Sequence, residues 1–372
     1  MLPVVLVGVL SAACEAALGL ALLFARPGRV GAARSLRAAW YVGLLAAAKA
    51  LLLLLALPMR SFFLLVLLGW TSAVLALPAL GLGTLLGARR REVAPGVRAF
   101  AAATLLLLPL GVWGSLVEPR ALRVESASVA LPAPRALPRA LRVAVLADLQ
   151  TRAIGAHERA AVDALLALEP DLILVPGDVA QLWPRPPEAA FEEFRALLAR
   201  LEAPLGAYAV RGNSDDPTFL RELCAATPLL LLDDEVAHVE RDGLRLAVCG
   251  LDLDFGSPRA RAALQRLVDD ARDDEPRLVL AHLPDAWRAL PREGVDLLVA
   301  GHTHGGQVVV PGFGPPLTLT GVPRHVAAGG LSELEGRRLY VSRGVGMERG
   351  WAPPLRLFCP PEVSLLVLEA AP

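Results

Sequence analysis

The sequence has no net charge and few cysteines. Its 37 lysine and arginine residues balance 37 aspartate and glutamate residues, so no strong field favours nucleic acid or an anionic surface as a partner. Three of its 4 cysteines follow residue 117, namely Cys224, Cys249 and Cys359, and an odd number allows at most one disulfide among them. No feature of the sequence indicates a nucleic-acid or protein partner.

Long apolar runs are abundant instead. The 372-residue chain is 55% hydrophobic with a mean hydropathy of +0.50, which is too apolar for a purely soluble protein and long enough for two domains. Core helices of a soluble protein are the weaker reading, because they show a polar face and these runs barely do. Each run is close to the ~20 residues that cross a bilayer as a helix. We therefore predict a multi-pass, all-α region of four transmembrane helices in residues 1–118, with spans at residues 2–24, 38–57, 61–86 and 100–117.

Arginines predict the sidedness of this region. Four lie in the first loop, four in the third and one in the second: Arg26, Arg29, Arg34, Arg37, Arg89, Arg90, Arg91, Arg98 and Arg60. The positive-inside rule then places the first and third loops in the cytoplasm, and everything after residue 117 outside it. A cleavable signal peptide is the alternative for the first segment, but the start of the chain lacks a basic region.

Two ionisable residues, Glu15 and Lys49, lie within the first two predicted spans. Their depths are similar, so adjacent antiparallel helices could pair them and spare each an unpaired charge in hydrocarbon. An ion pair that fixes helix packing is favoured over a proton or substrate path.

The rest of the chain predicts an α/β domain. Residues 119–140 contain Pro132, Pro134 and Pro138 and form a stiff tether, with a possible edge strand at residues 122–131. Residues 141–372 then alternate β-rich and helical patterns. Expected strands lie at residues 141–147, 171–175, 206–210, 277–281 and 296–300, expected helices at residues 157–168, 188–201, 217–226 and 257–271, and a hairpin at residues 229–250.

Polar residues directly follow five of these strands. They are Asp148 and Gln150, then Asp178, then Asn213, Ser214 and Asp215, then His282, and finally His302 and His304. Each alone has an ordinary explanation as a cap or turn residue. Together they place carboxylates, amides and imidazoles at the carboxyl ends of strands, where sites in such sheets are found.

The order D-x-Q, G-D, G-N, H and G-H-x-H resembles the calcineurin-like metallophosphoesterase family, whose pattern is D-x-H, G-D, G-N-H-[DE], H and G-H-x-H. The later sequences YVSRG and CPPE resemble its membrane-attached or exported bacterial branch. The resemblance covers residues 141–368. It implies a double β-sandwich flanked by helices, that is, an αββα fold.

The same resemblance implies two metal ions with a hydroxide held between them. Asp148, Gln150, Asp178 and His304 would hold the first ion. Asp178, Asn213, His282 and His302 would hold the second, with Asp178 as the bridging carboxylate and Asp178 and Asn213 as the catalytic residues. The mixed oxygen and nitrogen donors favour Mn²⁺, with Fe²⁺ or Zn²⁺ as alternatives.

Two positions depart from the family pattern. Gln150 replaces a histidine and donates less to a cation than imidazole, so the first ion would bind more weakly. Ser214 replaces another histidine and cannot act as an acid near neutral pH, so general acid help worth roughly 10²–10⁴-fold would be missing. Ser214, Arg211 and Arg343 are candidate substrate contacts. For the two arginines, structural ion pairs are an equal alternative. Asp215 is expected to orient its neighbours.

We therefore predict a membrane-anchored, extracytoplasmic phosphoesterase that cleaves a phosphodiester or pyrophosphate bond in a phosphorylated small molecule, a lipid or a cell-envelope precursor. A metal-binding but weakly catalytic sensor or scaffold is the first alternative, suggested by Gln150 and Ser214. A transport role for the helices, suggested by Glu15 and Lys49, is the second.

Overall fold

This computed structural model describes residues 62–89, 92–181, 188–241, 243–348 and 354–370, together with Ser11, Ala13, Glu15, Ala16 and Gly19. The chain divides into two compact units. The first contains Met1–Val117 and Arg349–Pro354, and the second contains Glu118–Glu348 and Leu355–Pro372. Each unit is described by itself.

The described part of the first unit is helical. One helical run comprises α3 (Phe62–Thr71), η2 (Ser72–Ala76) and α4 (Leu77–Gly87), and the other comprises α5 (Pro95–Thr104), α6 (Leu107–Val112) and η3 (Trp113–Val117). Within them, Val66–Gly87 and Pro95–Arg120 are long and apolar enough to cross a membrane. They correspond to the third and fourth predicted spans. The last one starts at Pro95 rather than at residue 100, because proline is well suited to the first helical turn.

Small residues bring α4 and α5 close together. A side-chain carbon on Gly81 would lie 2.1 Å from the hydroxyl of Thr104 and 2.5 Å from the carbonyl of Ala101. Such close backbone approach is typical of helices that pack in membranes. The predicted spans at residues 2–24 and 38–57 lie outside the described residues, apart from the five named above, and so does Lys49. The predicted pairing of Glu15 with Lys49 therefore stays a prediction.

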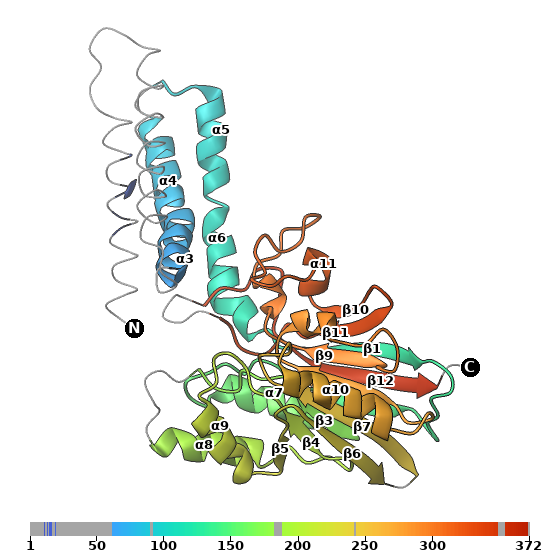
Figure 1. Ribbon diagram of the computed structural model, residues 1–372. Coiled ribbons are helices and arrows are strands. Elements are labelled where there is room, and N and C mark those ends of the chain that lie inside the picture. Colours follow the sequence, from blue (N-terminus) through green and yellow to red (C-terminus); the bar gives the residue numbers. More distant parts are fainter. Residues whose placement is uncertain are drawn as a thin grey trace. The chain divides into compact units, whose positions relative to one another are not determined.

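The second unit contains two six-stranded mixed sheets (Figure 1). The first sheet has the order β1-β12-β2-β3-β4-β5 and the second the order β10-β11-β9-β8-β7-β6. The strands of the first sheet are β1 (Arg123–Leu131), β2 (Leu141–Val145), β3 (Leu172–Val175), β4 (Ala207–Ala209), β5 (Leu229–Leu231) and β12 (Glu362–Ala370). Those of the second are β6 (Glu235–Arg241), β7 (Leu244–Leu251), β8 (Arg277–Ala281), β9 (Leu297–Ala300), β10 (Gly330–Leu334) and β11 (Arg337–Val341).

Helices cover the outer faces of both sheets. On the first sheet they are α7 (Ala156–Leu166), α8 (Glu188–Leu198) and α9 (Pro217–Ala225), and on the second α10 (Pro258–Asp270), η5 (Pro284–Arg288) and α11 (Arg324–Ala327). Between the sheets lies a third apolar cluster to which both contribute. Strands such as β3 and β9 are buried throughout, which explains their unbroken apolar sequences. The unit therefore has the predicted αββα layers.

One expected element differs in the structure. The predicted hairpin at residues 229–250 was wrong at its start. The first strand of this range, β5, joins the edge of the first sheet, and the antiparallel hairpin in the second sheet consists of β6 and β7. Local sequence does not reveal which sheet a short apolar run joins. The possible edge strand predicted at residues 122–131 is confirmed, because residues 123–131 form β1 at the edge of the first sheet and pair in parallel with β12 along their whole length.

Candidate metal centre

The five strands that deliver the predicted ligands run parallel to one another within each sheet. Strands β2, β3 and β4 run parallel in the first sheet, and β8 and β9 run parallel in the second. Their carboxyl ends therefore meet at one edge of the sandwich. Asp148, Asp178 and His282 follow β2, β3 and β8, and donor atoms of these three buried residues all lie within 4.8 Å of one another.

The backbone at the ligands is strained. Five of the seven predicted ligands have a positive φ: Asp148 (48°), Gln150 (39°), Asp178 (50°), His302 (72°) and His304 (49°). A residue with a side chain in this region costs on the order of 1–3 kcal/mol, and such strain concentrates at functional sites. The fold therefore holds these side chains in orientations that the chain would not adopt unaided.

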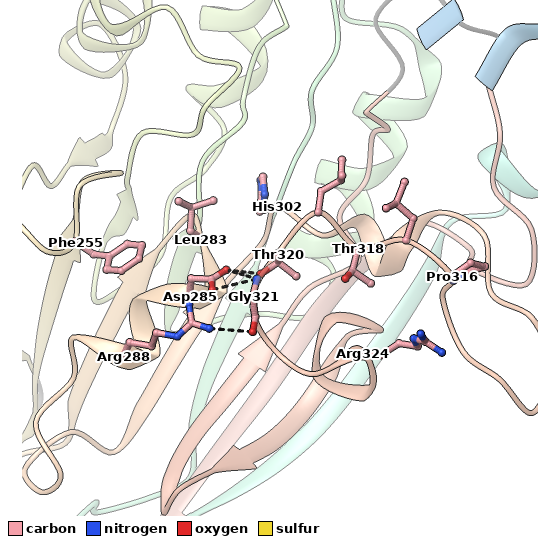
Figure 2. Close-up of a pocket in the computed structure, with 12 residues that line it drawn as sticks. Phe255, Leu283, Asp285, Arg288, His302, Pro316, Thr318, Thr320, Gly321 and Arg324 are labelled. Carbon is pink, nitrogen blue, oxygen red and sulfur yellow. Dashed lines mark hydrogen bonds and ion pairs between the residues drawn. The ribbon is translucent and has the colours of Figure 1, made fainter. Parts of the chain in front are cut away.

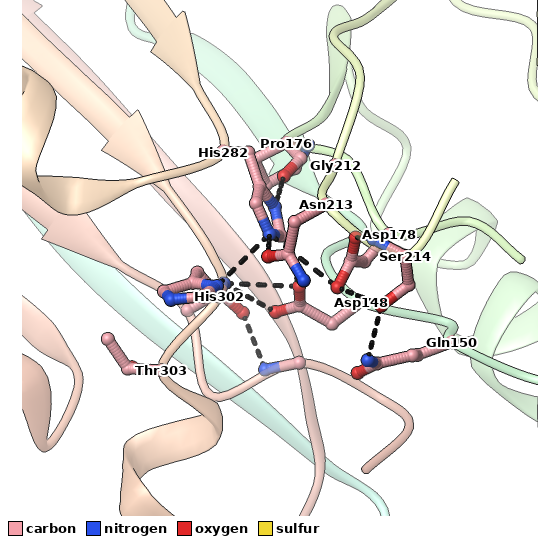
Figure 3. A network of polar contacts seen from close by, with 12 residues as sticks. Asp148, Gln150, Pro176, Asp178, Gly212, Asn213, Ser214, His282, His302 and Thr303 are labelled. Atoms are coloured by element: carbon pink, nitrogen blue, oxygen red, sulfur yellow. Dashed lines mark hydrogen bonds and ion pairs between the residues drawn. The ribbon is translucent and has the colours of Figure 1, made fainter. Parts of the chain in front are cut away.

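Figure 3 shows how the predicted ligands of the second ion converge on His282. Its Nε2 lies 2.8 Å from Oδ1 of Asn213 and 3.2 Å from Nδ1 of His302. The Asp178 carboxylate oxygen Oδ2 is 3.5 Å from the same nitrogen. Ligands at ~2.0–2.2 Å from one ion are separated by distances of this size.

The hydrogen bonds of His282 leave one ring nitrogen suited to bind a cation. Its Nδ1 lies 2.8 Å from the carbonyl oxygen of Pro176, which can only accept a hydrogen bond, so Nδ1 carries the proton. In the neutral ring Nε2 then has a lone pair that faces the amide oxygen of Asn213. A cation between these two acceptors would satisfy both. A carbonyl that holds the second nitrogen of a metal-binding histidine is common in such sites.

Gln150 presents an oxygen to the site. Its amide nitrogen donates to the hydroxyl of Ser214 at 2.8 Å and to the carboxylate of Glu348 at 2.6 Å. These two bonds fix the orientation of the amide, so the oxygen Oε1 points away from them. This atom is buried and has no hydrogen-bond partner among the described residues. A buried acceptor left unpaired costs ~1–3 kcal/mol, and a metal ion would satisfy it.

His304 presents a second unsatisfied atom. Its Nδ1 is buried and has no hydrogen-bond partner within the part of the chain that the structure describes. Burial, with the charge of Arg356, lowers the pKa of His304 well below its usual value. Burial and the neighbouring His282 lower the pKa of His302 to about 4. Both imidazoles are therefore neutral at pH 7, which is the form that binds a metal.

The carboxylates of the site repel one another. Burial and the charge of Asp178 raise the pKa of Asp148 well above its usual range, although the backbone N–H of His302 and the charge of Arg356 oppose the shift. Burial and Asp178 also raise the pKa of Asp215 to about 7. Divalent ions would compensate this accumulation of negative charge. The donor set as a whole fits the two ions that the sequence predicts.

Asp215 joins two of the ligand loops, as expected. Its carboxylate accepts from the backbone N–H of Ala180 at 2.9 Å and of Gly212 at 2.8 Å. It thereby fixes the segment after β3 against the segment after β4.

The predicted substrate contacts are engaged within the protein. Arg211 makes a bidentate ion pair with Asp252, at 2.9 and 2.7 Å, and Arg343 pairs with Glu362 and Glu125. Both pairings favour the structural alternative. The hydroxyl of Ser214 donates to Asp178 at 3.0 Å and accepts from Gln150, so its only proton is already used.

Glu348 was not recognised from the sequence. Its carboxylate accepts from Gln150 and, at 3.3 Å, from the side chain of Gln181. The residue follows no strand and has no recognisable spacing to the other site residues, so nothing local identifies it. Its contact with Gln150 makes it a positioning residue for the predicted first ion.

Glu348→Ala is expected to weaken Mn²⁺ binding by about 10–100-fold, because the amide of Gln150 would lose the acceptor that orients it. Titration of the metal-free full chain in detergent measures this effect. Glu333→Ala, which removes an exposed glutamate on β10, is the matched control and should bind as the native chain does. An affinity unchanged by Glu348→Ala would contradict the positioning role.

A pocket of about 800 Å³ lies beside the centre and includes His302 in its lining (Figure 2). One wall contains Phe255 and Leu283, and the other contains Pro316 and Thr318. The segment that contains Pro316 and Thr318 continues to Gly321, whose backbone N–H donates to the carboxylate of Asp285. The pocket combines apolar, hydroxyl and cationic side chains, which suits a substrate with both polar and apolar parts.

Comparisons with known proteins agree with this geometry. Residues 141–306 match the family described as calcineurin-like phosphoesterase. The phosphodiesterase YaeI of Escherichia coli is 32% identical over 207 residues, which cover 54% of this chain and 71% of the relative. The UDP-2,3-diacylglucosamine pyrophosphatase LpxG of Chlamydia trachomatis is 26% identical over 324 residues, or 71% of this chain and 94% of the relative. A transmembrane protein with a metallophosphoesterase domain from Bos taurus is 29% identical over 224 residues, which cover 55% of this chain and 47% of the relative.

Proposed function

The chain belongs to the calcineurin-like phosphoesterase family and is therefore a metallophosphoesterase. We propose that it cleaves a phosphodiester or pyrophosphate bond in a lipid or cell-envelope substrate by means of two divalent ions. The observation that carries the proposal is the convergence of Asp148, Asp178 and His282 at one edge of the sandwich. The unsatisfied atoms of Gln150 and His304 support it.

We assign the ligands as the sequence predicted them. Asp148, Gln150, Asp178 and His304 would hold one ion, and Asp178, Asn213, His282 and His302 the other. When bound, the ions would supply a nucleophile at neutral pH and a positive field for the phosphoryl oxygens. The mixed donors favour Mn²⁺, with Fe²⁺ and Zn²⁺ as alternatives.

The protein's own groups determine which bonds are cleaved. Asp178 is held by the backbone N–H of Ser214 at 2.7 Å as well as by its hydroxyl, so its position is fixed before substrate arrives. Because that hydroxyl has no proton to spare, Ser214 gives no acid assistance to the leaving group. The site therefore favours leaving groups that depart without protonation, such as the phosphates of a pyrophosphate bond.

Three observations support a lipid or envelope substrate. The described residues contain two helical runs that are long and apolar enough to cross a membrane, and the relative LpxG is named for a diacylated sugar nucleotide. The pocket beside His302 has both apolar and cationic lining.

The test compares two lipids that carry the same acyl chains. With the full chain in detergent and Mn²⁺ present, hydrolysis of a diacylated sugar-nucleotide pyrophosphate should exceed that of an alkyl phosphodiester by about 10²-fold, because no acid assists the poorer leaving group. Equal rates would show that another group supplies the proton. Hydrolysis of neither lipid would contradict the proposed substrate class.

A metal-binding but weakly catalytic sensor or scaffold is the second candidate. The commitment of the Ser214 hydroxyl to Asp178 and Gln150 favours it, because a site without an acid turns over slowly on unactivated bonds. This candidate predicts bound metal without hydrolysis even of pyrophosphate and aryl substrates.

We also propose that the phosphoesterase unit lies outside the cytoplasm of a multi-pass membrane protein. The arginine distribution in the loops supports this sidedness. A periplasmic or extracellular reporter fused after residue 372 should be active. A reporter active only in the cytoplasm would reverse the assignment.

A further inference from the structure

Large apolar side chains are exposed in two segments near the candidate metal centre. They are between 43% and 61% exposed, and we call them the apolar rim: Val310, Phe313, Leu317, Leu319 and Phe358. Leu319 and Phe358 have φ values of 50° and 55°, a conformation that bulky residues rarely adopt. A strained backbone that holds large apolar side chains in water does not stabilise the isolated unit. We therefore expect an apolar partner surface to cover the rim.

The rim is continuous through backbone contacts. The N–H of Val309 donates to the carbonyl of Leu357 at 2.9 Å, and the N–H of Leu357 donates to the carbonyl of Gln307 at 2.8 Å. The segment that contains Phe358 therefore runs beside the one that contains the other four rim residues. Leu317 and Leu319 also line the pocket that includes His302.

A hydrogen bond joins the segment after Phe358 to the first residue of the phosphoesterase unit. The backbone N–H of Cys359, which follows Phe358, donates to the carboxylate of Glu118. Glu118 belongs to the phosphoesterase unit and lies within the apolar helical run Pro95–Arg120. The residue that follows the rim residue Phe358 is thus hydrogen-bonded to the residue at which the chain enters the phosphoesterase unit.

The charge of the segment also suits a lipid surface. The sequence from Gly301 to Ser332 contains no aspartate or glutamate. Arg324 lies over the ring of Phe313, with its guanidinium carbon 4.2 Å from the ring centroid, and both side chains are exposed. An aromatic ring beside a cation is the combination that binds the interface between acyl chains and headgroup phosphates.

We propose that the apolar rim inserts into the surface of a phospholipid bilayer. The pocket beside His302 then opens at the lipid surface, and a headgroup can reach the centre while its acyl chains stay in the membrane. Insertion of the rim requires only that the chain is attached to a membrane. The delivery of substrate rests in addition on the proposed function.

The test is lipid quenching of a fluorescent label on the full chain. Single cysteines at Phe313→Cys and Leu317→Cys carry the label, in a background where Cys14 is serine and the cysteines of the phosphoesterase unit are buried. The matched control is Leu230→Cys, an equally exposed leucine on β5. The protein is reconstituted in vesicles of phosphatidylcholine and phosphatidylglycerol, with acyl chains brominated near the headgroup.

Labels at positions 313 and 317 should lose about half of their emission, since an inserted apolar surface lies ~5–10 Å into the boundary between headgroups and acyl chains. The label at position 230 should be unaffected. Quenching at 313 and 317 no greater than at 230 would overturn the proposal. Labels protected from aqueous iodide but not quenched by the lipid would also overturn it, because a protein or a second copy of the chain would then cover the rim. The readout needs no hydrolysis, so it is independent of the proposed activity.

Discussion

Asp178→Asn is expected to reduce kcat for phosphodiester hydrolysis by about 10³-fold or more. Its carboxylate is the only predicted ligand shared by both ions, and Oδ1 and Oδ2 are held by Ser214 at 2.7 and 3.0 Å. The amide keeps the shape but removes the charge that both ions would share, so stabilisation of the transition state should be lost rather than substrate binding alone. Steady-state kinetics of the full chain with an aryl phosphodiester and Mn²⁺ measures the effect.

Asp163→Asn is the matched control for this substitution. Asp163 is an exposed aspartate on α7 that pairs with Arg200 at the surface, so its replacement should leave kcat unchanged. If Asp178→Asn kept more than about a tenth of the native kcat, the bridging role would be refuted, since loss of a shared ligand cannot be that mild.

Gly212→Ala is expected to lower the free energy of unfolding of the phosphoesterase unit by about 3 kcal/mol and to abolish metal binding. A side-chain carbon at this position would lie 2.1 Å from both the backbone nitrogen and Oδ1 of Asp178. No rotation of a side chain relieves a contact with backbone, so the loops after β3 and β4 must separate. Denaturant unfolding followed by near-ultraviolet circular dichroism gives the change.

Gly256→Ala provides the control for this prediction. The nearest atom to its added carbon is 3.6 Å away, in Asp254, which is an ordinary contact distance. Its stability should change by less than about 0.5 kcal/mol. Native stability in Gly212→Ala would mean that the close approach of the two loops is not required for the fold.

The ligand-bearing parts of the fold were predictable because their signals are local. An apolar run that ends in glycine and a carboxylate, amide or histidine identifies a strand and its carboxyl end within a few residues. Parallel strand order then brings Asp148, Asp178 and His282 to one edge. The helices α7, α9 and α10 were likewise predictable from the local pattern of apolar and polar residues.

Other features depend on contacts between distant parts of the chain. Glu348 contacts Gln150 across 198 positions of sequence. Strand β1 pairs with β12, beginning with Arg123 opposite Glu362. Arg356 is fully buried, and its guanidinium donates to the carbonyls of Arg343 and Gly344 in the loop before it. No periodicity or short spacing predicts such contacts. The positive φ values of the ligands also arise from the assembled loops rather than from residue type.

The two departures from the family pattern are linked in the structure, although the sequence presents them separately. The amide nitrogen of Gln150 needs acceptors, and the hydroxyl of Ser214 is one of them. A histidine at position 214 would have to replace both this bond and the one to Asp178. The glutamine and the serine therefore form one arrangement that would present an amide oxygen to the predicted first ion.

The most direct test of this account counts the divalent ions bound to the purified full chain while phosphodiester hydrolysis is followed in the same samples, as ions are removed by a chelator and returned as Mn²⁺. We expect about two ions per chain, with hydrolysis that disappears on chelation and returns as the second ion binds. Hydrolysis that persists in the metal-free chain, or saturation with Mn²⁺ that restores no hydrolysis, would contradict it.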